Sequence, residues 1–207
     1  MSLEKLVLEL FGRVTTLEEK NKELTGRIDA LEKTNGVNLT PAEDEEIKIT
    51  RSKARDYLIE NLKKHNPAFD IKKGNREMGA DLVVTKSRLT YPLMANFYFS
   101  KSHEESFIRG WHTVKEEDLR NENIHFFVFL VEHNGKFYNW LFDRVGLLVF
   151  CSENKKLLDS KNTYHFYFTV KDGKNYEARD GEIDALPFYD KWDVPTDHMG
   201  IKGAVAK

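Results

Sequence analysis

The chain has 207 residues, of which 40% are hydrophobic and 12% aromatic, and this is enough to bury the core of one ordinary domain with an appendage. Its formal net charge of -2 argues against a uniformly basic coat that covers nucleic acid. No apolar run approaches the roughly 18 residues of a membrane span, and the charged N-terminus does not resemble a signal peptide. The lone Cys151 lies in an apolar run and is most simply a small buried residue, so we expect a cytoplasmic protein.

Residues 1–36 carry a heptad repeat, with leucine at one core position and β-branched residues at the other. The repeat consists of Leu3, Val7, Leu10, Val14, Leu17, Asn21, Leu24, Ile28 and Leu31. This choice of residues favours a parallel two-stranded coiled coil, in which only the partner's asparagine satisfies a buried Asn21. We therefore expect a homodimer through residues 1–36. The alternative is a single amphipathic helix packed on its own domain.

Asn35 and Gly36 suit the end of this helix, and residues 37–47 are interpreted as a linker. From Ile49 to Leu62 the apolar residues fall on one helical face, which predicts the first helix of a globular domain over residues 48–195. Residues 196–207 are expected to form a flexible tail.

The pattern then changes to β-rich runs. Residues 68–73, 80–86 and 92–101 predict a three-stranded meander, and a short helix is expected from Val114 to about residue 123. Residues 124–133 are apolar almost throughout, which is typical of a central strand buried on both faces.

Tight turns and further elements follow. Asn134 and Gly135 predict a hairpin turn into a returning strand at residues 136–142, and residues 143–150 are expected to be helical or irregular. Residues 163–181 predict a further strand with an Asp-Gly turn. The histidines show no zinc-ligand spacing, and the tryptophans are most simply core residues.

Positive charge is concentrated in one part of the chain. Between Lys48 and Ser102 there are 12 Lys or Arg and 5 Asp or Glu, whereas residues 171–207 contain 6 and 8. This surplus suits a polyanionic substrate, although a solvated lysine-rich surface is equally compatible with it. The candidate DNA-binding residues within it are Arg76, Lys86 and Arg88.

The order of helix, three-stranded meander, helix and strand, with Asp81 on the middle strand and Lys101 ending the next, resembles the PD-(D/E)XK restriction-endonuclease-like superfamily. The resemblance spans residues 49–150. It implies an α/β (α+β) fold in which a mixed β-sheet is flanked by helices, here preceded by the long coiled-coil helix. It also implies a Mg²⁺-dependent endonuclease working as a homodimer.

The resemblance implies a catalytic role for Asp81 and Lys101, with Asp81 binding the metal ion. A second acid is expected two residues before the lysine, where this chain has Phe99, which offers no oxygen ligand. Glu77 is the replacement we favour as a catalytic and metal-binding acid, and the other candidates are Glu60, Glu104 and Glu105.

Simpler interpretations stand beside this one. Asp81 suits a strand start that caps the turn after Gly79, and Lys101 suits a solvated strand end. The alternative function is therefore an inactive nuclease-like module that binds DNA or another protein and is assembled by its coiled coil. A structural dimer that binds no nucleic acid is the third hypothesis.

Overall fold

The computed structural model describes residues 14, 19, 20, 49–75, 77–86 and 91–197. Residues Ile47–Lys207 form one compact unit, separate from Met1–Glu46. Of the predicted heptad core only Val14 is described, and it is helical. The dimer, the linker and the end of the tail therefore stay predictions.

The first helix of the compact unit, α2 (Arg51–His65), begins at Thr50, whose hydroxyl accepts a hydrogen bond from the backbone N–H of Lys53. Its buried residues Ala54, Leu58 and Leu62 recur every four positions, as expected for a helix with one face on a core. The helix ends at Asn66, directly before Pro67.

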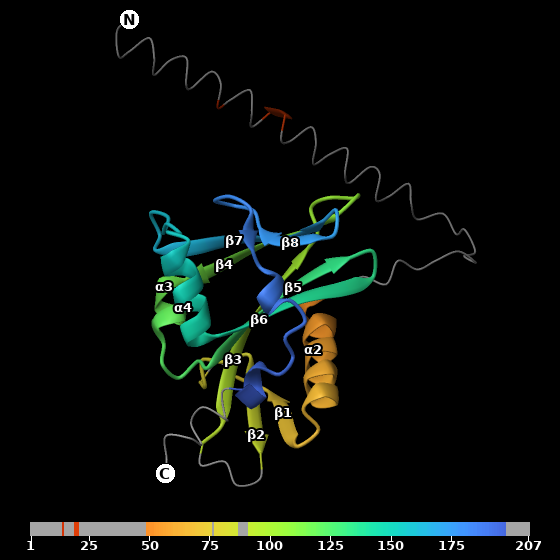
Figure 1. Cartoon of the computed structure of the whole chain (residues 1–207), viewed down its shortest axis with the longest axis vertical. Coiled ribbons are helices and arrows are strands. Elements are labelled where there is room, and N and C mark those ends of the chain that lie inside the picture. The colour runs from red at the N-terminus through yellow and green to blue at the C-terminus, as the bar shows by residue number, and fades with distance from the viewer. Residues whose placement is uncertain (1–13, 15–18, 21–48, 76, 87–90, 198–207) are drawn as a thin grey trace, which may run out of the picture. The chain divides into compact units, whose positions relative to one another are not determined.

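A five-stranded sheet, here called the first sheet, packs against this helix (Figure 1). Its strands in spatial order are β1 (Phe69–Lys73), β2 (Leu82–Lys86), β3 (Leu93–Lys101), β5 (Phe126–His133) and β6 (Lys136–Asp143). The pair β3 and β5 is parallel, and every other neighbouring pair is antiparallel. The sheet is therefore mixed.

A four-stranded antiparallel sheet, here called the second sheet, lies above the first in Figure 1. Its strands in order are β4 (Ile108–Lys115), β7 (Thr163–Lys171), β8 (Lys174–Glu177) and β9 (Ile183–Asp184). Two helices, α3 (Glu116–Arg120) and α4 (Arg144–Glu153), and the 3₁₀ turn η1 (Leu186–Phe188) complete the described elements.

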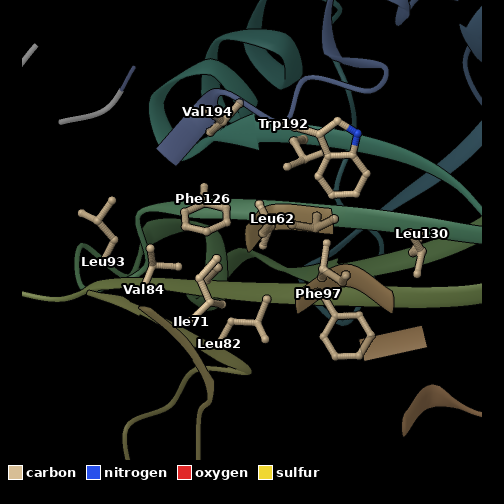
Figure 2. Packing of buried hydrophobic residues seen from close by; sticks show 14 of the residues in the cluster. Leu62, Ile71, Leu82, Val84, Leu93, Phe97, Phe126, Leu130, Trp192 and Val194 are labelled. Carbon is tan, nitrogen blue, oxygen red and sulfur yellow. The ribbon is translucent and has the colours of Figure 1, made fainter. Parts of the chain in front are cut away.

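Two hydrophobic cores lie on opposite faces of the first sheet. The first core joins α2 to this sheet, and Figure 2 shows Leu62 of the helix among Ile71, Phe97 and Phe126 of the strands, with Trp192 from the C-terminal part. The second core is richer in aromatic residues and joins the other face to the second sheet and α4. Because it faces both cores, β5 has six consecutive fully buried residues, Phe126–Val131.

At Gly110 of β4 the two sheets approach each other closely. A Cβ atom at this position would collide with the side chains of Val131 in β5 and Ser100 in β3. The glycine therefore permits the sheet-to-sheet contact, and we expect larger residues here to separate the sheets.

The two hairpin turns predicted from the sequence are confirmed. Asn134 and Gly135, between β5 and β6, have φ angles of 50° and 76°, and Asp172 and Gly173, between β7 and β8, have 51° and 74°. Two successive positive φ angles are typical of the type I′ turn, whose twist matches that of antiparallel strands.

The predicted mixed α+β fold with flanking helices is confirmed, and so are the meander and the central strand. The predicted short helix is present as α3, but it begins at Glu116 and not near Val114, because β4 continues to Lys115. Among the described residues, no helix is long and apolar enough to cross a membrane.

Candidate functional site

Asp81 lies immediately before β2, where the loop from Gly74 returns to the sheet. The loop is closed by a 2.8 Å hydrogen bond from the backbone N–H of Gly74 to the carbonyl of Asp81. The Asp81 N–H donates to the carbonyl of Ala95 at 3.0 Å, and its Oδ2 accepts from the N–H of Phe97 at 3.0 Å. The carboxylate thus accepts a backbone N–H of β3 at the end of the β2–β3 ladder, whereas the capping interpretation placed it on the turn after Gly79.

Arg51 forms an ion pair with both oxygens of this carboxylate. Its Nη2 atom lies 3.1 Å from Oδ1 and 3.0 Å from Oδ2 of Asp81, and 2.9 Å from the carbonyl oxygen of Phe97. The guanidinium carbon also lies 4.2 Å from the centre of the Phe97 ring. The positively charged group beside Asp81 is therefore an arginine fixed by hydrogen bonds and by a cation–π contact.

Lys101 does not lie beside Asp81. The β2–β3 register places Asp81 opposite Asn96, and Lys101 lies five residues farther along β3, which is about 16 Å for an extended strand. Lys101 is exposed and pairs in register with Glu132 of β5. The structure thus separates the two residues that the resemblance implies should act together.

The replacement acids are not gathered around Asp81 either. Glu77 is exposed in the loop between β1 and β2, and Glu60 is exposed on α2. Glu104 lies 3.3 Å from Nη1 of Arg109, and Glu105 is exposed in the segment before β4. Among the described residues, no three His, Cys, Asp or Glu side chains are placed to hold a metal ion.

Phe99 takes the place of the expected second acid and belongs to the hydrophobic packing. It packs against the first core and meets Phe137 edge-on, with 6.4 Å between ring centres. A divalent magnesium ion needs oxygen ligands at about 2.1 Å, and this position supplies none. The described residues around Asp81 therefore do not fit the Mg²⁺ ion that the resemblance implies.

A second polar group lies beside Asp81. The hydroxyl of Tyr98 in β3 lies near Asn96 and near Asp118 of α3. Burial, and after it the charges of Asp118 and Asp81, raises the pKa of the Tyr98 hydroxyl. Burial, followed by the charge of Glu117, raises the pKa of Asp118. Tyr98 and Asp118 therefore form a polar pair close to Asp81.

Of the candidate DNA-binding residues, Lys86 is described, whereas Arg76 and Arg88 lie outside the described residues. Lys86 is exposed at the end of β2, and its Nζ atom lies 5.2 Å from the centre of the Phe69 ring. It is one of six exposed lysines on α2, β1 and β2, which are neighbouring elements, and we call this set the basic edge. Its members are Lys53, Lys63, Lys64, Lys72, Lys73 and Lys86.

Trp111 was expected to be a core residue, and this expectation was wrong. Trp140 and Trp192 are buried, but Trp111 is 46% exposed on β4. The alternation of Arg109, Trp111, Thr113 and Lys115 with the less polar residues between them is the sequence signal for an outward-facing tryptophan.

The described residues also form a cavity of about 600 Å³ where the β5–β6 turn meets the ends of β4 and β7. Its lining includes the cationic side chains of Lys136 and Lys171, together with His133, Phe107 and Asp172. The cavity lies apart from Asp81 and Arg51, neither of which contributes to its lining.

Comparisons with known proteins yield little. No family model and no curated protein matches the chain. Among solved structures, a bacterial homing endonuclease matches with a TM-score of 0.43 and 11% sequence identity. The match covers 74% of this chain and 98% of that chain.

Proposed function

We propose that this chain is a nucleic-acid-binding protein with a restriction-endonuclease-like domain that does not hydrolyse DNA at Asp81. The observation that carries the proposal is the position of Arg51, whose Nη2 atom lies within 3.1 Å of both Asp81 carboxylate oxygens. A guanidinium group there neutralises the acid that the resemblance assigns to a metal ion. Binding without cleavage is the chemistry that this arrangement favours.

The cost of restoring a metal site supports the proposal. An incoming Mg²⁺ ion would have to displace Arg51 from Asp81 and also from the carbonyl oxygen of Phe97. It would then find Phe99 where the second acid is needed and Lys101 about 16 Å along the strand from Asn96. Of the residues that the resemblance assigns to the metal ion, only Asp81 would remain, and one carboxylate is too small a protein ligand set for metal-assisted hydrolysis.

The strand arrangement supports the nuclease-like part of the proposal. The helix α2, the meander β1-β2-β3, the helix α3 and the strand β5 follow in the order that the resemblance implies. This chain inserts β4 between β3 and α3, and the inserted strand begins the second sheet.

The basic edge supports binding to a polyanion. Its six exposed lysines lie among three exposed acids, Asp56, Glu60 and Asp70. Two of these acids pair with lysines of the same edge, Asp56 with Lys73 at 2.9 Å and Asp70 with Lys72 at 2.7 Å. A surface with this surplus attracts phosphates and releases counterions on binding.

The heptad repeat supports a dimer. We propose that residues 1–36 pair two chains in parallel, with Asn21 opposite the same residue of the partner subunit. Two copies related by a two-fold axis would present two basic edges to one duplex, which raises affinity by linking two binding events.

The binding proposal is tested with a fluorescently labelled DNA duplex titrated at several salt concentrations. We expect the affinity to fall steeply with salt. Lys64→Ala should weaken binding. It should also reduce the slope of log affinity against log salt concentration by about 0.9 for each phosphate that the variant no longer neutralises. Lys161→Ala, which removes an exposed lysine from the turn before β7, is the matched control and should leave both values unchanged. A parent chain that shows no salt-dependent binding would refute the proposal.

A further inference from the structure

The outer face of the second sheet carries cationic, aromatic and hydroxyl side chains. On β4, Gly110, His112 and Val114 are buried, so Arg109, Trp111, Thr113 and Lys115 point away from the core. The opposite residues of β7 are Thr169, Tyr167, His165 and Thr163. None of these eight described positions holds a carboxylate, and we call this surface the aromatic face.

Trp111 is nearly parallel to two other rings of this face. Its ring plane is within 25° of that of Tyr167, its partner in register, and within 22° of that of His165. The distances between ring centres are 6.3 Å to Tyr167 and 5.9 Å to His165, too long for full face-to-face overlap. The three rings therefore form an offset, nearly parallel cluster, in which Trp111 is 46% exposed.

Hydrogen bonds hold this surface in place. The indole N–H of Trp111 donates to Nδ1 of His165 at 3.2 Å, and Nε2 of His165 lies 2.8 Å from Oδ2 of Asp159. An indole N–H can only donate, so Nδ1 of His165 must accept this hydrogen bond. The ring hydrogen is therefore on Nε2, which donates to Asp159. The Asp159 carboxylate is also fixed by backbone N–H groups of Lys161 and Thr163. Trp111 is thus ordered before any ligand arrives, which reduces the entropy lost on binding.

Cations border the aromatic surface. The guanidinium of Arg179 lies 5.7 Å from the ring centre of Tyr167. Arg109 and Lys171 lie on the same ring of Phe107, at 4.9 Å and 4.8 Å from its centre. Arg109 is oriented by two 3.3 Å hydrogen bonds, from its Nε to the hydroxyl of Thr169 and from its Nη1 to Oε1 of Glu104, so a phosphate beside it would share the guanidinium with this acid. An exposed tryptophan in an aromatic cluster bordered by Arg and Lys suits a chain of stacking rings linked by phosphates.

We propose that the aromatic face binds single-stranded nucleic acid, with an unpaired base stacked on Trp111 and backbone phosphates beside Arg109, Arg179 and Lys171. This inference rests on the proposed function and extends it, because a duplex hides the faces of its bases and the basic edge contacts phosphates only. A neutral polysaccharide also stacks on flat aromatic rings. It is disfavoured here because it carries no negative charge to pair with Arg109, Arg179 and Lys171.

The test measures binding of fluorescently labelled oligothymidylate to the full chain, its Trp111→Ala variant and its Trp111→Phe variant. Stacking on Trp111 predicts a decrease of about ten- to one-hundredfold in affinity for Trp111→Ala and a smaller decrease for Trp111→Phe. Duplex affinity should change less than about twofold in both variants. Because Trp140 and Trp192 are buried, quenching of the parent's exposed indole by unlabelled oligothymidylate should disappear in Trp111→Phe.

Two further variants, one beside the aromatic face and one in the basic edge, distinguish a failure of this inference from a failure of the proposed function. Arg179→Ala should weaken oligothymidylate binding with duplex affinity unchanged, whereas Lys64→Ala should weaken duplex binding. Duplex binding by a parent whose oligothymidylate affinity does not depend on Trp111 would overturn this inference alone. Binding of neither nucleic acid would overturn the proposed function as well, and Trp111-dependent binding of amylose with no oligothymidylate binding would reassign the face to polysaccharides.

Discussion

At the scale of single residues, Asp81 shows how one carboxylate can serve structure where a catalytic role is expected. It accepts a backbone N–H from β3 and pairs with an arginine from α2, so it connects three elements. The side chains of this pair are 53% and 28% exposed, so the pair itself contributes only about 1 kcal/mol after screening by solvent. The hydrogen bond from the N–H of Phe97 adds a similar amount.

Removing this carboxylate should affect stability and leave binding intact. We expect Asp81→Ala to lower the free energy of unfolding by about 1–3 kcal/mol, because Phe97 N–H and Arg51 lose their acceptor. Urea denaturation measures this change, and the DNA affinity should stay within about twofold. Glu77→Ala, which removes an exposed carboxylate of the same loop, serves as the control and should change neither quantity. Unchanged stability in Asp81→Ala would contradict the structural role.

His112 is a buried imidazole whose two ring nitrogens have no hydrogen-bond partner among the described residues. Burial, with a smaller effect of His103, lowers its pKa from 6.5 to about 3. Between these values the unfolded chain binds a proton that the folded chain does not bind, so the stability falls as the pH decreases from about 6.5 towards 3.

Replacing this histidine with phenylalanine removes that titration. The ring of His112 already packs against Phe129 and Phe168, so a phenylalanine ring would keep most of this packing and remove two unpaired polar atoms. We expect His112→Phe to be more stable than the parent, with a difference that grows from about pH 7 to pH 4. Chemical denaturation at several pH values measures it, and a difference independent of pH would contradict the assignment.

At the scale of elements, the second sheet is joined to α4 by a buried ion pair. Lys156, just after the helix, places Nζ 2.6 Å from Oε2 of Glu177 in β8, and both side chains are at most 1% exposed. Glu177 also accepts the backbone N–H groups of Tyr167 and Arg179. The pair therefore fixes the helix end, the hairpin and the segment after β8 together.

Breaking this pair leaves Glu177 with an uncompensated buried charge. We expect Lys156→Met to lower the free energy of unfolding by about 3–5 kcal/mol. Thermal or urea unfolding would show the effect, with Lys161→Met as the control because Lys161 is exposed. A decrease below about 1 kcal/mol would mean that Glu177 finds another partner.

The elements differ in how far the sequence predicts them. The hairpin turns and the buried β5 follow from local rules, since Asn-Gly and Asp-Gly favour positive φ angles and an apolar run suits a two-faced strand. The strand at residues 108–115 is harder to predict from sequence, because its alternation of buried and exposed residues is short and Gly110 interrupts it. A glycine is needed at position 110 because Val131 and Ser100 of the other sheet pack against it. A local sequence pattern carries no information about this contact.

The candidate site is predicted less well than the fold for a similar reason. The sequence places Asp81 on the middle strand and Lys101 at the end of the next, but only the register shows that Lys101 lies five residues beyond the position opposite Asp81 on β3. Arg51 lies 30 positions before Asp81, and no motif spacing signals their contact. Long-range pairing therefore decides whether this acid binds a metal ion or an arginine.

At the scale of the whole molecule, the predicted dimer determines how many binding surfaces act together. We expect equilibrium sedimentation of the full chain to give a dimer at micromolar concentration, and a chain without residues 1–36 to give a monomer. Duplex affinity should then fall because the two basic edges no longer act on one ligand. A monomeric full chain, or a dimer that survives the deletion unchanged, would refute this prediction.

Cleavage of supercoiled plasmid DNA tests the central claim most directly. The full chain is incubated with the plasmid and Mg²⁺ or Mn²⁺ at a protein concentration where binding is saturated. Because Arg51 neutralises Asp81 and Phe99 replaces the second acid, we predict that the bound plasmid stays supercoiled. Metal-dependent nicking by the parent that is lost in both Asp81→Ala and Lys101→Ala would contradict the account.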